Sequence, residues 1–362
     1  MSDLFRADYR DLRVYGGDSK GFSVDLSDNT NQWGTPPAAE RALRAAAESM
    51  LRGYPEPYGE SLKDAIAEHV GVTREWIVTG TGSDDILDCG FRALGKSGDK
   101  VAYQSPTFVM VPTFARTNGL EPSAVSLTSN YDADIEGLLA VNAQITYLCT
   151  PNNPTGTPLT RAAVEAVVDR AKGFVVIDEA YVDFAEDNFA DLVRRSPRVL
   201  IARTFSKAFG LAGARIGYGI ASPELITEIE KARGPYKLTS IGERAARAAI
   251  VEDKEWVREK VRAAIEAREW LRRELEQRRI STPPSQSNFL FVPIANAPEI
   301  AARMAKDGVA VRPFANLPKL DDQLAATDGN ALRITVGPMP LMQTMLESFD
   351  RARTALSAAR SG

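Results

Sequence analysis

The stretch Val199–Tyr218, which reads VLIARTFSKAFGLAGARIGY, joins an apolar run to a lysine and a loop rich in glycine and alanine. The run Val199–Ala202 predicts a strand buried on both faces, because all four of its residues are apolar. Open α/β sheets bind their ligands just beyond the carboxyl ends of such strands, where Lys207 is expected. Partial burial there lowers the pKa of a lysine toward that of an amine nucleophile. A lone loop lysine is more often solvated, so the role of Lys207 depends on its neighbours.

Composition narrows the class of protein. The chain has 362 residues, 44% of them hydrophobic and 25% charged, with a formal net charge of −4. This length predicts about two domains, and the charge does not favour nucleic acid as a partner. Cys89 and Cys149 are too few for a disulfide framework or a cysteine metal cluster, and they are expected to be reduced core residues. The single histidine, His69, lies near the end of a predicted helix and fits a helix-terminus role. We therefore expect no metal site.

Two further features concern location. The opening MSDLFRADY is too polar for a signal peptide, and no apolar run approaches the roughly 20 residues that span a membrane. We therefore expect a cytoplasmic protein that has no membrane among its partners.

Apolar runs alternate with helical stretches over much of the chain. Each predicted strand ends in a loop that carries polar groups, and helical stretches such as 160–172 separate several strands. The predicted strands are 76–79, 100–103, 145–149, 174–177 and 199–202. This order favours an α/β fold with a mostly parallel sheet, whose strand-end loops gather at one edge.

Beyond Tyr236 the pattern changes to a long charged helix, three short strands and a final helix. We interpret this part as a smaller α+β domain completed by the amino-terminal segment. The predicted boundaries are 36–245 for the large domain, with 1–35 and 246–362 forming the small one.

The segment Gly90–Ser97 matches the nucleotide-binding pattern G-x-x-x-x-G-K-[ST], and Asp178 could serve as the accompanying acidic strand end. A P-loop must follow a strand and open a helix. Here the match continues a helix that begins near Asp84, and Gly95 fits its C-terminal cap. A P-loop ATPase therefore remains only a remote alternative.

Several strand-end groups suit one ligand. They comprise a glycine-rich turn at a helix start, an aromatic ring, an amide, a carboxylate, a phenol, a lysine and an arginine. In that order they are Gly82 and Ser83, Phe108, Asn153, Asp178, Tyr181, Lys207 and Arg215. Pyridoxal phosphate is a flat anionic aldehyde with a ring nitrogen, and it would use all of them.

Six motifs carry a family resemblance. They are YPE at Tyr54, GSDD at Gly82, PNNPTG at Pro151, DEAY at Asp178, SKAFGLAG at Ser206 and LRITV at Leu332. In these motifs, and in their order along nearly the whole chain, the sequence resembles the fold type I pyridoxal-phosphate aminotransferases, most of all the histidinol-phosphate aminotransferase branch. The resemblance implies a large domain with a mostly parallel seven-stranded sheet flanked by helices, together with a small α+β domain.

The resemblance also implies roles toward the cofactor. Lys207 would form the Schiff base and shuttle the proton, while Asp178 would pair with the ring nitrogen. Asn153 and Tyr181 would reach the ring hydroxyl, and Phe108 would stack on the ring where the branch often has tyrosine. The implied phosphate ligands are Gly82, Ser83, Asp84, Ser206 and Arg215, together with Tyr54 from the neighbouring subunit of a homodimer.

The implied reaction moves an amino group from an amino acid or amino-alcohol phosphate to a 2-oxo acid such as 2-oxoglutarate, in amino acid biosynthesis. Arg333, helped by Arg312, would bind the substrate carboxylate or phosphate.

The branch usually shows Asn-Glu-Asn-Pro where this chain has NTNQWG at 29–34, so Asn31 and Trp33 are expected to alter the substrate pocket. The alternatives are an aromatic amino acid aminotransferase and a decarboxylase of a phosphorylated amino acid. A cofactor-binding module without catalysis is disfavoured by the intact Lys207 and Asp178.

Overall fold

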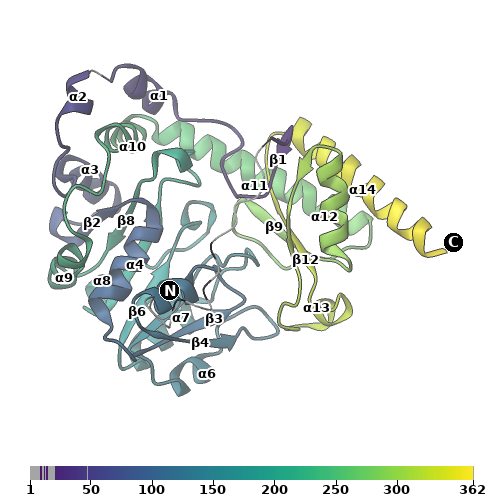
Figure 1. The fold of residues 1–362 in the computed structure, drawn as a ribbon, viewed down its shortest axis with the longest axis horizontal. Coiled ribbons are helices and arrows are strands. Elements are labelled where there is room, and N and C mark those ends of the chain that lie inside the picture. Colours follow the sequence, from purple (N-terminus) through teal and green to yellow (C-terminus); the bar gives the residue numbers. More distant parts are fainter. Residues whose placement is uncertain (1–8, 10–11, 13, 15–20, 47, 362) are drawn as a thin grey trace, which may run out of the picture.

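A seven-stranded sheet forms the centre of the larger group of elements in the computed structural model, which describes residues 9, 12, 14, 21–46 and 48–361 (Figure 1). Its strands are β2 (Ile77–Gly80), β3 (Lys100–Ser105), β4 (Glu121–Ser126), β5 (Ile145–Cys149), β6 (Phe174–Asp178), β7 (Val199–Thr204) and β8 (Gly217–Ile220). They lie in the order β2-β8-β7-β6-β5-β3-β4. Strand β8 runs antiparallel to both its neighbours, and the remaining pairs are parallel. The predicted α/β class with a mostly parallel sheet is confirmed.

The central strands are apolar because both faces of the sheet are covered. Val175 and Ile177 of β6 belong to one hydrophobic cluster, and Val176 between them belongs to another. This alternation follows from the twofold period of a strand. Helices α3 (Glu60–Val70), α7 (Arg161–Arg170), α8 (Leu192–Arg195) and α10 (Ser240–Glu252) contribute to the first cluster, and α4 (Gly82–Leu94), α5 (Val111–Thr117) and α9 (Pro223–Arg233) contribute to the second. A further helix, α6 (Ile135–Ala140), packs against α7.

A second group of elements lies beside the first, and the long helix α11 (Lys254–Gln277) runs from one group to the other (Figure 1). Its antiparallel sheet has the order β11-β12-β9. The bounds are β9 (Phe289–Pro293), α12 (Ala297–Lys306), β10 (Val309–Ala310), β11 (Arg312–Phe314), α13 (Asp322–Ala326), β12 (Ala331–Thr335) and α14 (Met339–Ser361). Strand β1 (Val24–Asp25) pairs with β10, which ties the amino-terminal segment to this group. The domain boundaries given above remain a prediction.

In the sequence, Ala42, Leu43, Ala46 and Met50 recur at spacings of three and four, a pattern typical of one helix that begins at Pro36. The structure instead has α1 (Pro37–Arg44) followed by the separate α2 (Glu48–Arg52). The buried residues of α1 are Ala38 and Ala39 in its first turn. Little apolar packing therefore holds the end of α1, and intrinsic propensity alone does not extend a short helix.

The P-loop look-alike is part of a helix, as predicted. Gly90 lies inside α4, and a Cβ atom at this position would come within 2.8 Å of the Leu200 side chain on β7. Gly95 caps the helix through a bond from its N–H to the carbonyl of Phe91. The first glycine of the pattern thus serves helix–sheet packing, and no strand precedes it to form a phosphate loop.

Candidate active site

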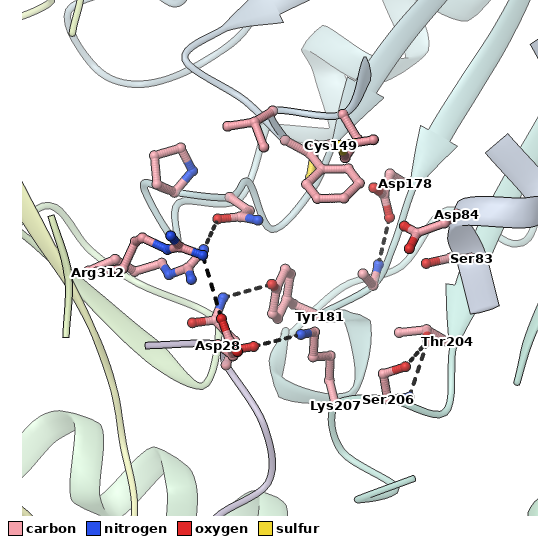
Figure 2. Close-up of a pocket in the computed structure, with 18 of the residues that line it drawn as sticks. Asp28, Ser83, Asp84, Cys149, Asp178, Tyr181, Thr204, Ser206, Lys207 and Arg312 are labelled. Carbon is pink, nitrogen blue, oxygen red and sulfur yellow. Dashed lines mark hydrogen bonds and ion pairs between the residues drawn. The ribbon is translucent and has the colours of Figure 1, made fainter. Parts of the chain in front are cut away.

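A cavity of about 630 Å³ opens beyond the carboxyl ends of the central strands and faces β11 and β12 (Figure 2). Most of the side chains predicted from the sequence meet here. Those that line it are Ser83, Asp84, Phe108, Asn153, Asp178, Tyr181, Ser206, Lys207, Arg215, Arg312 and Arg333. The parallel strands bring residues far apart in the sequence to one edge, as the fold rule for such sheets requires.

Lys207 lies three residues beyond the end of β7, and its side chain points into the cavity (Figure 2). Its Nζ atom donates a hydrogen bond to the main-chain oxygen of Asp28 at 3.1 Å and lies 5.8 Å from the centre of the Tyr181 ring. Burial, reinforced by the positive charge of Arg333, lowers the pKa of Lys207 to about 8. A substantial fraction of the amine is therefore neutral near physiological pH, as a nucleophile requires.

Asp178 is the last residue of β6 and is buried. Its Oδ2 atom accepts a hydrogen bond from the Tyr147 hydroxyl at 2.7 Å, and its Oδ1 atom accepts one from the Ala180 amide at 3.1 Å. Burial raises the pKa of Asp178 to about 6, although both hydrogen bonds oppose that shift. The carboxylate is thus ionised at pH 7 while its two donors are neutral. A protonated ring nitrogen in the cavity would supply an opposite charge.

The start of α4 forms one end of the cavity. Gly82 has φ of 79°, and a Cβ atom there would lie 2.8 Å from Nη2 of Arg215, so a side chain would collide with the guanidinium. Arg215 also lies 3.3 Å from Asp84, and Ser206 accepts a hydrogen bond from the Thr204 hydroxyl at 2.9 Å. Free amides at a helix start, a guanidinium and a hydroxyl together suit a phosphate.

The opposite end of the cavity carries two arginines. Arg333 on β12 lies directly across from Arg312 on β11 in the antiparallel pair. Nη1 of Arg333 donates to the Asn153 side-chain oxygen at 2.7 Å, and Nη2 of Arg312 lies 3.6 Å from the Asp28 carboxylate. This end is therefore suited to an anionic group of a substrate.

Four predicted residues do not line the cavity of the single chain, namely Gly82, Tyr54, Asn31 and Trp33. Tyr54 is 85% exposed, and its ring centre lies 4.9 Å from that of Tyr236. Asn31 instead braces its own turn, because its side chain donates to the Ala208 carbonyl and accepts from the Trp33 amide, each at 2.9 Å. The Trp33 ring packs against the main hydrophobic cluster. The expected contacts of Asn31 and Trp33 with substrate, and of Tyr54 with a neighbouring site, remain predictions.

Sequence reasoning missed other groups at the site. Asp28 and Thr30 line the cavity, and Asn29 donates from Nδ2 to the Tyr181 hydroxyl at 2.8 Å. The segment 29–34 had been linked to the substrate pocket only through Asn31 and Trp33, so Asp28, Asn29 and Thr30 were not identified. Tyr147 contacts Asp178 from within a buried strand, where the sequence carries no sign of a polar role.

Both cysteines are core residues, as predicted, whereas His69 is an exposed residue at the end of its helix. Cys89 and Cys149 are free and buried, and burial raises the pKa of both thiols. His69 lies in the last turn of α3, with its ring centre 6.3 Å from that of Phe209, and partial burial lowers its pKa. Within the described ranges, no cluster of three or more possible metal ligands occurs. None of the helices in the described part of the chain is long and apolar enough to cross a membrane.

Known proteins share this sequence and fold. The family model for aminotransferase class I and II matches residues 23–349. The histidinol-phosphate aminotransferase of Methanopyrus kandleri is 38% identical over 312 residues, which cover 80% of this chain and 79% of the relative. The enzyme of the same name from Geotalea uraniireducens is 32% identical, covering 90% and 91% of the two chains. The crystal structure of histidinol-phosphate aminotransferase from Sinorhizobium meliloti, in complex with pyridoxal-5'-phosphate, matches with a TM-score of 0.86 and 26% identity over 98% of both chains.

Proposed function

Because the chain belongs to the class I and II aminotransferase family, we propose that its amino donor is an amino-alcohol phosphate of the histidinol-phosphate type. The protein is a pyridoxal-phosphate-dependent aminotransferase. In the proposed reaction the amino group of the donor passes to a 2-oxo acid such as 2-oxoglutarate, as a step in amino acid biosynthesis.

The pairing of Arg312 with Arg333 carries the proposal about the donor. Directly opposed residues of an antiparallel pair project from the same face of the sheet, and both of these side chains line the cavity. Two neighbouring guanidinium groups suit a phosphate dianion better than they suit a single carboxylate. The Asp28 carboxylate beside Arg312 adds an acceptor for a substrate N–H, such as that of an imidazole ring.

The other residues of the cavity suit the cofactor. When bound, pyridoxal phosphate supplies an electron-accepting ring. The Lys207 amine would bond to the aldehyde carbon, with the aldehyde oxygen lost as water, and would later carry the proton between substrate atoms. Asp178 would hold the ring nitrogen in its protonated form, and Arg215 with the start of α4 would hold the phosphate.

Further cofactor contacts rest on the family resemblance. Asn153 and Tyr181 would orient the ring through its hydroxyl, and Phe108 would cover one face. Ser83, Asp84 and Ser206 would complete the phosphate site.

We also propose a homodimer in which Tyr54 reaches the site of the neighbouring subunit. Tyr54 and Leu51 are exposed to 85% and 71%, and Tyr236, in contact with Tyr54, is exposed to 46%. Tyrosines are enriched at interfaces because their rings are apolar and their hydroxyls can pair. The proposed location is the cytoplasm, which suits the two free cysteines.

A panel of amino donors tests the proposed reaction. With 2-oxoglutarate as acceptor, we expect kcat/KM to be highest for histidinol phosphate and to fall at least about tenfold for histidinol, which lacks the phosphate. A preference for phenylalanine or tyrosine would instead identify an aromatic amino acid aminotransferase. Release of carbon dioxide from a phosphorylated amino acid, without consumption of the oxo acid, would identify a decarboxylase.

A further inference from the structure

We infer that Tyr147 is a positioning residue of this active site, which holds Asp178 ionised and aimed into the cavity. Tyr147 lies in the middle of β5 and is fully buried, and among the described residues that line the cavity it does not appear. It therefore acts on the cofactor only through Asp178. The inference rests on the cofactor assigned above.

Strand register places the two side chains together. Cys149 on β5 lies opposite Asp178 on β6, and Tyr147 is two residues before Cys149. Tyr147 and Cys149 thus share one face of the sheet, from which the tyrosine reaches diagonally to the strand end. The hydroxyl donates to Oδ2 of Asp178 at 2.7 Å, while the Ala180 amide occupies Oδ1 at 3.1 Å. The two donors fix the plane of the carboxylate.

Several groups act on the protonation state of Asp178 in opposite directions, and the Tyr147 hydroxyl is one of them. Burial and the negative charges of Asp84 and Glu179 favour the neutral acid, while the Tyr147 hydroxyl and the Ala180 amide favour the carboxylate. Cys149, which faces the same carboxyl group from β5, has a raised pKa and contributes no charge. A neutral Asp178 could not hold a protonated ring nitrogen as an ion pair. Removing the hydroxyl therefore favours the form that binds the cofactor less well.

Tyr147 keeps its proton under all ordinary conditions. Burial and the nearby Asp178 carboxylate raise its pKa well above the usual value for a phenol. It can therefore serve as a fixed donor but not as an acid or base of the reaction. Its effect should appear in cofactor affinity and in pH dependence rather than in a proton-transfer step.

Tyr103 offers a matched control. It lies directly opposite Tyr147 in the β3–β5 pair, packs against the same hydrophobic cluster, and is not among the described residues that line the cavity. Tyr103→Phe removes the same atom one strand farther from Asp178. A loss shared by both variants would reflect the sheet, whereas a loss confined to Tyr147→Phe reflects the contact with Asp178.

The experiment compares wild type, Tyr147→Phe, Tyr103→Phe, Asp178→Asn and the double variant Tyr147→Phe/Asp178→Asn. Apoprotein is titrated with pyridoxal phosphate to obtain Kd, and the absorbance of the bound cofactor is followed against pH. Thermal unfolding of each apoprotein checks the fold. We expect Tyr147→Phe to raise Kd about tenfold or more, the usual scale for a hydrogen bond to a charged group, and Tyr103→Phe to leave it within about twofold.

The absorbance titration separates a tuning role from a purely structural one. A protonated ring nitrogen makes the nearby Lys207 nitrogen less basic. In Tyr147→Phe the ring nitrogen should hold its proton less firmly, so the Lys207 nitrogen should become more basic and the absorbance midpoint should move to higher pH. Tyr147→His keeps a ring donor and should lie between wild type and Tyr147→Phe. In the Asp178→Asn background, adding Tyr147→Phe should change the midpoint no further.

Three results would overturn the inference. The first is that Tyr147→Phe has the same Kd and the same absorbance midpoint as wild type. The second is that Tyr103→Phe loses as much cofactor affinity as Tyr147→Phe does. The third is that Tyr147→Phe shifts the midpoint as far in the Asp178→Asn background as it does in wild type. Failure of the wild-type protein to bind pyridoxal phosphate would instead overturn the cofactor assignment itself. The two kinds of failure are therefore distinguishable.

Discussion

The Nζ atom of Lys207 and the main-chain oxygen of Asp28 lie 3.1 Å apart, which connects the segment after β7 to the amino-terminal segment across the cavity. This carbonyl is one of the groups that replace water around the amine. It is neutral and offsets only part of the cost of burying a charge. Burial and the positive charge of Arg333 therefore prevail, and the pKa of Lys207 falls from 10.5 to about 8.

The first prediction concerns the pH dependence of cofactor capture. Only the neutral amine attacks an aldehyde, and its fraction rises with pH up to the pKa and then levels off. With a pKa of about 8, the initial rate of covalent capture by apoprotein should rise about fivefold from pH 7 to pH 8 and change little above pH 9. Stopped-flow absorbance at fixed pyridoxal phosphate measures this rate.

Lys207→Ala is the control for that measurement, because it should show no covalent capture at any pH and no transamination. A wild-type rate that kept rising about tenfold per pH unit beyond pH 9 would contradict the prediction. Such a profile belongs to a solvated lysine, whose pKa lies near 10.4.

The central strands could be predicted from the sequence because the helices on both faces demand unbroken apolar runs. The run 199–202 predicted β7, but the strand continues through Arg203 and Thr204, which are also buried. Arg203 is tolerated there because its guanidinium pairs with the buried Glu179 at 2.7 Å. From the sequence alone, a polar residue such as Arg203 looks like the end of a strand, because the charged residue that pairs with it lies in another segment of the chain.

The sequence predicted those residues of the candidate site that belong to motifs at the ends of strands. Lys207 and Asp178 each follow an apolar run, and the parallel topology brings them together. The contact of Tyr147 with Asp178 and the opposition of Arg312 and Arg333 depend on strand register. Register follows from packing across strands, which one sequence does not display. Asp28 was missed because a short polar turn carries no periodic signal.

The second prediction concerns the two arginines. Arg333→Lys should lower kcat/KM for the amino donor about 10- to 100-fold, because lysine cannot reproduce the planar fork of a guanidinium. Arg312→Lys should cost less, about tenfold or below, since Arg312 is shared with Asp28. Steady-state kinetics with histidinol phosphate and with histidinol measure both effects. If Arg333→Lys affected both donors equally, the guanidinium would not be recognising the phosphate.

The third prediction concerns Asp28. Asp28→Asn removes the negative charge beside Arg312 and weakens the acceptor for a substrate N–H. We expect kcat/KM for histidinol phosphate to fall about 5- to 10-fold relative to that for phenylalanine, which has no polar side-chain donor. The measured quantity is the ratio of the two kcat/KM values.

Asp25→Asn is the matched control, because Asp25 accepts hydrogen bonds from Ser27 and is not among the described residues that line the cavity. It should leave the ratio of kcat/KM values unchanged. An Asp28→Asn ratio equal to that of wild type would remove Asp28 from substrate selection.

The fourth prediction tests the homodimer through Tyr54. If Tyr54 serves the neighbouring site, Lys207→Ala and Tyr54→Ala impair different halves of each composite site. Mixing the two inactive or weakened proteins under conditions that exchange subunits then creates hybrid dimers. In a hybrid, one site takes Lys207 from the Tyr54→Ala chain and Tyr54 from the Lys207→Ala chain, so it is intact.

We therefore expect the mixture to gain activity above the sum of its components, approaching about a quarter of the wild-type level at equal amounts. Random pairing makes half of the dimers hybrid, and each hybrid has one intact site of two. Titration with pyridoxal phosphate should show a matching fraction of high-affinity sites. Lys207→Ala mixed with Asp178→Asn is the control, because both residues lie in the same chain's cavity and the hybrids contain only defective sites. Equal recovery in that control, or none in the Tyr54 mixture, would mean that Tyr54 does not complete a neighbouring site.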